Sequence, residues 1–345
     1  MTKKTIITIL IIILFGITLY LSWSYFGKDL FIKKDTNTNV SNNTNSNILS
    51  KESEEDLLDY VVSDTEVLKL LTNGNITKID QDNNEEILSG SEIEDIFYSE
   101  FSPEKKYLLI GYGEAQKTFS IFNLQQKEWI QLPQKTSGVA WNPSGEKIAY
   151  ITSDLQLKVF TIKTKNSKTL SILPIAESDI FWPNENEIYF SDKPSGFHSG
   201  FIISYNLNTG KFKTINEKIG LTTHWLNNEQ RIDSYYSQDG LKKSSLTSNQ
   251  NIIEFPIGAP IPFKCTSNKK IIFCGITRTT NNILLPDDYI KNNLEENIVS
   301  WNIETDEIKT ITTNQQSISI QNPSIYKEKL FFINRYDNKL YSIKI

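Results

Sequence analysis

The chain has few of the residues that most often carry out chemistry in enzymes. Its 345 residues include only two histidines, His198 and His224, and two cysteines, Cys265 and Cys274. Neither histidine lies near the cysteines in the sequence, so we expect no metal site, and we expect no cofactor. The sequence also lacks the G-x-S-x-G, H-E-x-x-H, phosphate-binding-loop and EF-hand patterns, and this argues against the classes that these motifs define.

Clustered positive charge is also missing. Lysine and arginine never form a run longer than a pair, and the formal net charge is −5. A nucleic-acid-binding surface needs a basic patch that neutralises phosphates, so we expect no nucleic-acid partner. The content of 38% hydrophobic and 22% charged residues is ordinary for a globular protein, and the length is enough to bury a large core.

The longest apolar segment lies at the N-terminus. Residues 5–27 form 23 consecutive positions without charge, rich in isoleucine and leucine. This length spans a bilayer as a helix, and aromatic residues at its end match the membrane interface: Tyr20, Trp23, Tyr25 and Phe26. No small-x-small cleavage site or lipid-attachment cysteine follows, so we expect an uncleaved signal anchor.

A polar linker follows the anchor. In residues 35–47, eleven of thirteen positions are asparagine, serine or threonine, and such a segment cannot bury enough apolar surface to order itself. We expect residues 1–4 to be cytoplasmic and residues 28–46 to tether an extracytoplasmic domain on the order of 20 Å from the membrane.

One short segment, WNPSGEKIAY (residues 141–150), has the pattern of a tight β-hairpin. Proline presets φ at the second turn position, asparagine and serine bond the local backbone, and Gly145 accepts a left-handed conformation. The alternating residues that follow the turn are typical of a strand. The segment therefore predicts two antiparallel strands.

The hairpin pattern recurs along the chain at intervals of 40, 40, 40, 44, 40 and 58 residues. Its seven first positions are Val61, Phe101, Trp141, Phe181, Trp225, Cys265 and Pro323. A repeat of about 40 residues made of strands and turns is typical of propeller blades. We therefore predict an all-β fold, a seven-bladed β-propeller over residues 47–345, with six or eight blades as alternatives. The blades are expected to start near residues 57, 97, 137, 177, 221, 261 and 318.

The last unit ends before a fourth strand. Residues 47–50 (NILS) lie 39 positions before EILS at 86–89, which is the expected outer strand of the first blade. We predict that residues near 47–50 complete the last blade and remove its free edge. The alternative is that NILS belongs to the tether.

The segments FSPEKKYLLI and WNPSGEKIAY resemble the S-P-D-G-K-x-I-A-F repeat of the TolB-like, WD40-like (PD40) β-propellers. The stretch PFKCTSNKKIIFCGI, followed by LLPDDYI and LFFINRYDNKLYSIKI, is similar to membrane-anchored bacterial members of that group. The resemblance covers residues 57–345. It implies a fold and no particular activity.

The two cysteines occupy the positions of Trp141 and Tyr150 in their own repeat. Opposite residues on adjacent strands lie close enough for a disulfide, and such a pair oxidises outside the cytoplasm. We therefore predict a Cys265–Cys274 disulfide, with two buried free thiols as the alternative.

Two loops between second and third strands are enlarged, at residues 192–200 and 277–297. Long loops on a rigid scaffold often carry function. The candidate binding residues are Phe197, His198, Asp287, Asp288 and Tyr289. The alternatives are that the loops only cap the channel and each other, and that the paired carboxylates cap a helical turn.

These observations favour a non-catalytic module of the cell envelope that binds a protein or glycan partner and is held by the N-terminal helix in the cytoplasmic membrane. The alternative is a glycan- or peptide-processing enzyme that uses the loop carboxylates Asp287 or Asp288 in the propeller mouth. That chemistry would need carboxylates from several blades to converge.

Overall fold

The computed structural model describes residues 49–90, 92–114, 116–176, 178–258, 260–278, 284–312 and 317–345. These residues belong to one compact unit. Within these ranges no helix has the length and apolar character needed to cross a membrane. The predicted anchor at 5–27 and the predicted tether at 28–46 lie outside the described residues.

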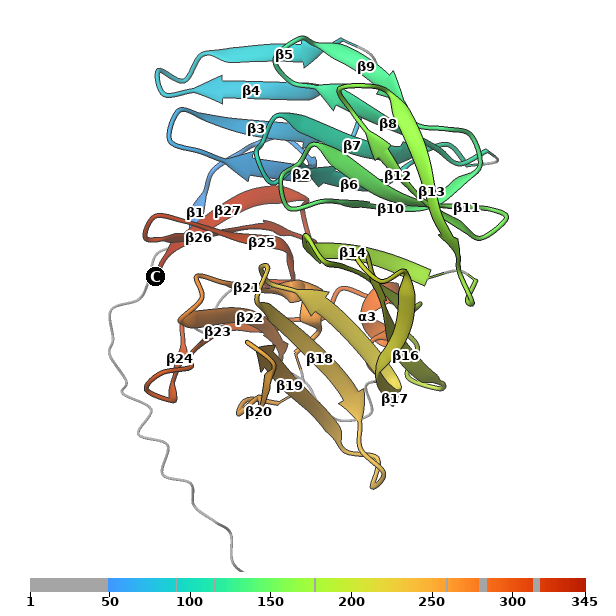
Figure 1. The fold of residues 1–345 in the computed structure, drawn as a ribbon. Coiled ribbons are helices and arrows are strands. Elements are labelled where there is room, and N and C mark those ends of the chain that lie inside the picture. Colours follow the sequence, from blue (N-terminus) through green and yellow to red (C-terminus); the bar gives the residue numbers. More distant parts are fainter. Residues whose placement is uncertain are drawn as a thin grey trace, which may run out of the picture. The chain divides into compact units, whose positions relative to one another are not determined.

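The described residues are almost entirely β-structure. They form 27 strands, one short α-helix, α3 (Asp287–Lys291), and one 3-10 turn, η2 (Pro262–Lys264). The strands make up six antiparallel sheets, in which strands that follow one another along the chain lie side by side, except that β1 pairs with β27 (Figure 1). The prediction of an all-β class is therefore confirmed.

Three sheets of four strands come first. The first sheet contains β2 (Leu57–Val62), β3 (Glu66–Leu71), β4 (Ile76–Asp80) and β5 (Glu85–Ser89). The second contains β6 (Ile96–Phe101), β7 (Tyr107–Tyr112), β8 (Thr118–Asn123) and β9 (Glu128–Gln131). The third contains β10 (Thr136–Trp141), β11 (Lys147–Thr152), β12 (Gln156–Thr161) and β13 (Asn166–Ile172).

A seven-stranded sheet and two further four-stranded sheets complete the fold. The long sheet contains β14 (Ser178–Asn184), β15 (Glu187–Asp192), β16 (Ser199–Asn206), β17 (Lys211–Trp225), β18 (Gln230–Tyr236), β19 (Lys242–Ser248) and β20 (Asn251–Glu254). The next contains β21 (Cys265–Ser267), β22 (Ile271–Thr277), β23 (Glu296–Asn302) and β24 (Glu307–Thr310). The last contains β25 (Ile320–Tyr326), β26 (Lys329–Asn334), β27 (Lys339–Lys344) and β1 (Ser50–Lys51).

The recurring hairpin turn has the local chemistry expected from its sequence. The side chain of Asn142 accepts the amides of Glu146 and Lys147 at 3.0 and 2.8 Å, and Gly145 has φ +67°. In the preceding repeat Ser102 accepts two amides in the same way, and Lys105 takes the left-handed position at φ +56°. The turn therefore forms without glycine, because the hydrogen bonds to the Ser102 hydroxyl offset part of the cost of the left-handed conformation at Lys105.

Strand β17 serves two groups of strands at once. Its residues 211–219 pair with β16, and its residues from 219 to 225 pair with β18. The change of partner coincides with Gly220, which has φ +66°, and with a register shift between Ile219 and Thr222. The predicted unit boundary near residue 221 therefore falls inside a continuous strand.

The two ends of the described chain meet in the last sheet. Ser50 pairs with Ser342 and Lys51 with Tyr341. The paired strand thus begins at the last residue of the NILS segment; Asn47 and Ile48 lie outside the described residues. The edge of β27 is covered as a result.

The hydrophobic core consists of six clusters, and each lies between the strands of two successive groups. One cluster joins the first and second sheets, for example, through Leu70 and Leu108. Another joins the last sheet to the first through Phe331 and Leu57. The sheets therefore follow one another in a closed ring. The first strands lie inside the ring, where β2 contacts both β6 and β25.

Candidate functional site

The two enlarged loops are fastened to each other. The amide of Gly196, between β15 and β16, donates to Oδ2 of Asp287 at 2.6 Å. The amide of Leu285 donates to the hydroxyl of Tyr236, at the end of β18, at 2.8 Å. A Cβ at Gly196 would lie 2.9 Å from the carbonyl oxygen of Leu285, so only glycine permits this approach. The insertion before β23 is thus held against the loop between β15 and β16 and against the end of β18.

The carboxylate of Asp288 holds its own turn. Its Oδ2 accepts the amide of Leu284 at 2.6 Å, and its carbonyl accepts the amide of Asn292 at 2.9 Å. Helix α3 follows directly after the cis Leu285–Pro286 bond. Both neighbouring carboxylates, Asp287 and Asp288, therefore accept backbone amides.

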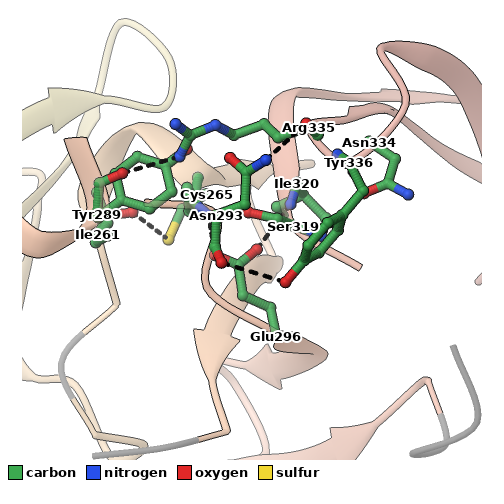
Figure 2. Close-up of polar contacts among 11 residues, drawn as sticks. Ile261, Cys265, Tyr289, Asn293, Glu296, Ser319, Ile320, Asn334, Arg335 and Tyr336 are labelled. Atoms are coloured by element: carbon green, nitrogen blue, oxygen red, sulfur yellow. Dashed lines mark hydrogen bonds and ion pairs between the residues drawn. The ribbon is translucent and has the colours of Figure 1, made fainter. Parts of the chain in front are cut away.

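The insertion is also fastened to the turn between β26 and β27. The guanidinium of Arg335 donates to the carbonyl of Tyr289 at 3.1 Å, and the side-chain amide of Asn293 donates to the carbonyl of Arg335 at 2.9 Å. The Tyr336 hydroxyl donates to the carbonyl of Asn293 at 3.2 Å. Figure 2 shows these contacts, which join Tyr289 and Asn293 of the insertion to Arg335 and Tyr336 of the turn. The insertion, which connects β22 to β23, is therefore fastened to two other sheets, the seven-stranded sheet and the last sheet.

Tyr289 lies beneath this bridge and does not reach the surface. Its side chain is 4% exposed. The Lys264 ammonium lies 3.6 Å from the ring centroid and the Arg335 guanidinium carbon lies 4.2 Å from it, so two cations contact one ring. Burial raises the pKa of the phenol to about 12, and Arg335 opposes this shift. Tyr289 anchors the insertion from within.

A buried ion pair supports the same region. Lys264, which ends η2, and Glu296, which begins β23, are both fully buried and bond to each other. Ser319 is a further partner of the ammonium at 3.2 Å, and Oε2 of Glu296 accepts the amide of Ile320 at 2.7 Å. Burial lowers the pKa of Lys264, with a smaller contribution from Arg335. The carboxylate therefore compensates a charge that the interior disfavours.

Two of the five predicted binding residues face solvent. Phe197 is 71% exposed, and His198 is exposed while its carbonyl accepts the amide of Gly220 at 2.8 Å. On the fastened insertion, Ile290 of α3 is 56% exposed. The outer surface of the joined loops thus presents apolar side chains.

A second group of ionisable residues lies on the first strands, and our sequence interpretation did not identify it. Asp59 of β2 is 7% exposed and accepts the amide of Tyr60 at 2.8 Å and the side chain of Asn322 at 3.1 Å. Glu100 of β6 accepts the hydroxyl of Tyr98. Desolvation by the surrounding strands raises the pKa of both carboxyls to about 7, although the side chain of Glu100, unlike that of Asp59, is exposed to solvent.

Acidic side chains from three strands raise the pKa of the Tyr98 phenol. Its pKa is raised well above 10, first by burial and then by Glu100, with further contributions from Asp59 and from Asp179 of β14. The sequence signal for this group is an acidic residue inside each of three apolar first strands, LLDYVV, IFYSEF and SDIFWPN. An acidic side chain in an apolar first strand lowers the stability of the fold unless it points to the inside of the ring and away from the hydrophobic core.

The two cysteines are bonded to each other. Cys265 of β21 and Cys274 of β22 are directly opposite in register, with an S–S distance of 2.05 Å and a Cα–Cα distance of 4.1 Å.

Burial lowers the pKa of His224 to about 4, which keeps its imidazole neutral at physiological pH. Among the described residues, no three His, Cys, Asp or Glu side chains are grouped so that they could hold a metal ion.

Comparison with known proteins identifies the fold. No family model matches the chain, and no curated protein matches its sequence. An oligogalacturonate lyase solved in complex with manganese is similar with a TM-score of 0.60 and 10% identity, over 81% of this chain and 85% of the lyase. An uncharacterized protein of Listeria monocytogenes EGD-e gives a TM-score of 0.58 and 13% identity, over 84% and 94% of the two chains.

The tricorn protease is similar over 87% of this chain but only 34% of the protease, with a TM-score of 0.54 and 9% identity. The lyase and the protease are both β-propeller folds. At such low identity these similarities indicate a shared fold and say nothing about activity. Membership of the TolB-like family stays a prediction. The described part of this chain therefore has a β-propeller fold.

Proposed function

We propose that the chain is a seven-bladed propeller, held outside the cytoplasmic membrane by a helix at residues 5–27, that binds an envelope protein without catalysing a reaction. The uncharged N-terminal segment supports the anchor. The blade count is supported by five four-stranded sheets and one seven-stranded sheet. That sheet divides at Gly220 into two four-stranded blades that share β17.

The hydrogen bond between Asp287 and Gly196 carries the proposal. It joins two loops from different sheets, and the Tyr236 and Arg335 contacts hold the same insertion. A surface that is already rigid loses little entropy when a partner binds. Phe197 is 71% exposed on this surface, and burying a phenylalanine side chain against a partner contributes about 1.5–3 kcal/mol.

The same contacts speak against chemistry at Asp287 and Asp288. Each carboxylate accepts a backbone amide at 2.6 Å, which gives each a structural role in holding the loops. A general acid or base has to reach a proton of the substrate. We therefore assign both residues to the support of the contact surface.

In-cell crosslinking of the full-length chain tests the proposal. The variant Phe197→Ala/Ile290→Ala removes two exposed apolar side chains of the joined loops. The control Ile87→Ala/Ile172→Ala removes side chains that are 61% and 69% exposed on β5 and β13. We expect the loop variant to lose its crosslinked partner and the control to keep it. Equal capture by both variants would contradict a role for the loops.

A second candidate function is acid–base catalysis by Asp59 and Glu100. Groups with a pKa of about 7 are well suited to proton transfer near neutral pH, and both carboxyls have such values. Incubation of the purified full-length chain with envelope glycans and peptides would test this function. Turnover in the wild type that is lost in Glu100→Gln would assign an enzymatic activity to these carboxyls, and no turnover in the wild type would contradict it.

A further inference from the structure

The junction at β17 differs from every other junction between neighbouring groups of strands. The six hydrophobic clusters fill the other junctions of the ring. Within the described part of the chain, no such cluster lies between β14–β16 and β18–β20. A groove of about 980 Å³ lies there instead, within the upper range of small-ligand sites.

The groove arises from the alternation of side chains along β18 and β19. Arg231, Asp233 and Tyr235 line it, whereas Ile232 between them belongs to the cluster shared with the next sheet. On the opposite wall Tyr189 lines the groove, while its neighbour Ile188 packs in the cluster shared with the preceding sheet. Each strand thus has an apolar face and a polar face, and the polar faces meet at the groove.

A rigid ion pair forms part of the groove wall. Arg231 donates to both oxygens of Asp233, at 2.9 and 2.8 Å, and the two residues are 8% and 1% exposed. Asp233 also accepts Thr223 at 2.7 Å and Asn216 at 3.2 Å. These bonds satisfy the buried charges internally. The pair therefore supplies a fixed polar surface and not a free charge for an ionic ligand.

The lining as a whole has no formal net charge and is rich in amides and aromatic rings. Three basic residues (Lys213, Lys218, Arg231) balance three acidic ones (Glu187, Glu229, Asp233), so the formal charge is 3 − 3 = 0. Seven asparagines and one glutamine line the same space. Each primary amide can donate and accept hydrogen bonds, as a sugar hydroxyl does.

Aromatic side chains supply the apolar part of the groove. Tyr189, Trp225 and Tyr235 line it and are partly exposed. The Tyr189 and Trp225 rings lie 4.8 Å apart, and the Arg231 guanidinium lies 5.4 Å from the Trp225 centroid, which fixes their positions. Rigid aromatic rings present broad apolar surfaces at low entropic cost.

We propose that this groove binds a neutral oligosaccharide. The amides would bond the sugar hydroxyls, and the aromatic side chains would cover the apolar C–H faces of the rings. With three cations and three anions in the lining, the groove favours neither an acidic nor a basic ligand by its net charge. The inference goes beyond the proposed binding of an envelope protein and uses none of the loop residues.

Calorimetric titration of the full-length chain in detergent micelles tests this inference. The probes are neutral hexasaccharides of glucose and of N-acetylglucosamine, a uronic-acid hexasaccharide and a set of extended peptides. We expect at least one neutral hexasaccharide to bind, and to bind more tightly than the acidic hexasaccharide and every peptide. If no neutral sugar binds, or if a peptide or the acidic sugar binds best, the inference is overturned.

Substitutions then place the ligand in the groove. Thr247→Trp fills the groove from β19 and Tyr235→Ala removes an aromatic ring, whereas Tyr235→Phe retains the ring. Thr310→Trp, at an exposed position of β24, is the matched control. We expect at least a tenfold loss of affinity in the first two variants and wild-type affinity in the other two, with all four melting near the wild type. Wild-type affinity in Thr247→Trp would overturn the assignment.

Discussion

Oδ2 of Asp287 accepts the backbone amide of Gly196 at 2.6 Å, across 91 positions of sequence. This bond joins a loop of the seven-stranded sheet to the insertion between β22 and β23. Because both partners lie on loops that connect second and third strands, the bond makes a single surface out of two connections. The stability of that surface can be tested separately from its function.

Replacing Asp287 by alanine should loosen the loop pair without unfolding the ring. The amide of Gly196 loses its acceptor, and one such charge-assisted bond contributes about 1.5–3 kcal/mol. We expect faster hydrogen exchange at Gly196 in Asp287→Ala, and protection at Ile188 in the core unchanged. Asp287→Asn keeps an acceptor and is the control. Unchanged exchange at Gly196 in the alanine variant would show that the loops are held by other contacts.

The ion pair between Lys264 and Glu296 should be costly to break and inexpensive to replace. Both side chains are fully buried, so removing one partner leaves an uncompensated charge and costs about 3–5 kcal/mol. We expect Glu296→Leu and Lys264→Met each to lower the free energy of unfolding by this amount, measured by denaturant titration. The double variant should recover most of the loss. Additive losses in the double variant would contradict the pairing.

Removing the Cys265–Cys274 disulfide should cost modest stability. The bond closes a loop with a sequence separation of 9, for which the chain-entropy estimate is about 2–3 kcal/mol. We expect Cys265→Ala/Cys274→Ala to be destabilised by roughly that amount and reductant to have no further effect on it. If reductant leaves the wild-type protein unchanged, the bond makes no contribution to stability.

Asp59 should make the protein less stable as the pH rises. Its pKa is about 7 in the folded protein against a usual value of 3.8, so the folded state binds more protons than the unfolded state between these values. The free energy of unfolding therefore falls from pH 4 to pH 7, and the penalty above pH 7 is on the order of 4 kcal/mol.

The variant Asp59→Asn removes this penalty because its side chain stays neutral and still accepts hydrogen bonds. We expect the variant to be more stable than the wild type at pH 8 and close to it at pH 4, measured by denaturant titration. Equal stability of the two proteins at pH 8 would show that the Asp59 carboxyl does not titrate with a raised pKa.

The repeated hairpin made the architecture predictable from the sequence. The turn residues around Gly145 and the spacing of 40 residues depend on local conformation and on one repeated packing problem, and both are visible in a single sequence. The fusion of two blades through β17 was not predicted. The sequence between Ile219 and Leu221 contains no proline and no turn pattern, which is compatible with one continuous strand. A glycine at position 220 is equally compatible with a break, and only the fold shows that the strand continues through it.

The candidate site was only partly predictable. Loop length pointed to residues near Phe197 and Asp287, but a contact across 91 positions leaves no local signal. The sequence placed Tyr289 among the binding residues, whereas packing against Lys264 and Arg335 buries it. The groove does have a signal that we did not use: Asp233 occupies the repeat position at which Leu109, Ala149 and Phe273 stand.

The most direct test of the account is a photo-crosslinking amino acid at position 197 of the full-length chain in its own membrane, compared with one at position 87. Phe197 and Ile87 are 71% and 61% exposed, so the two probes differ in location more than in accessibility. The account predicts a discrete protein adduct from position 197 that weakens in the Asp287→Ala background, and none from position 87. The same adducts from both positions, or none from position 197, would contradict it.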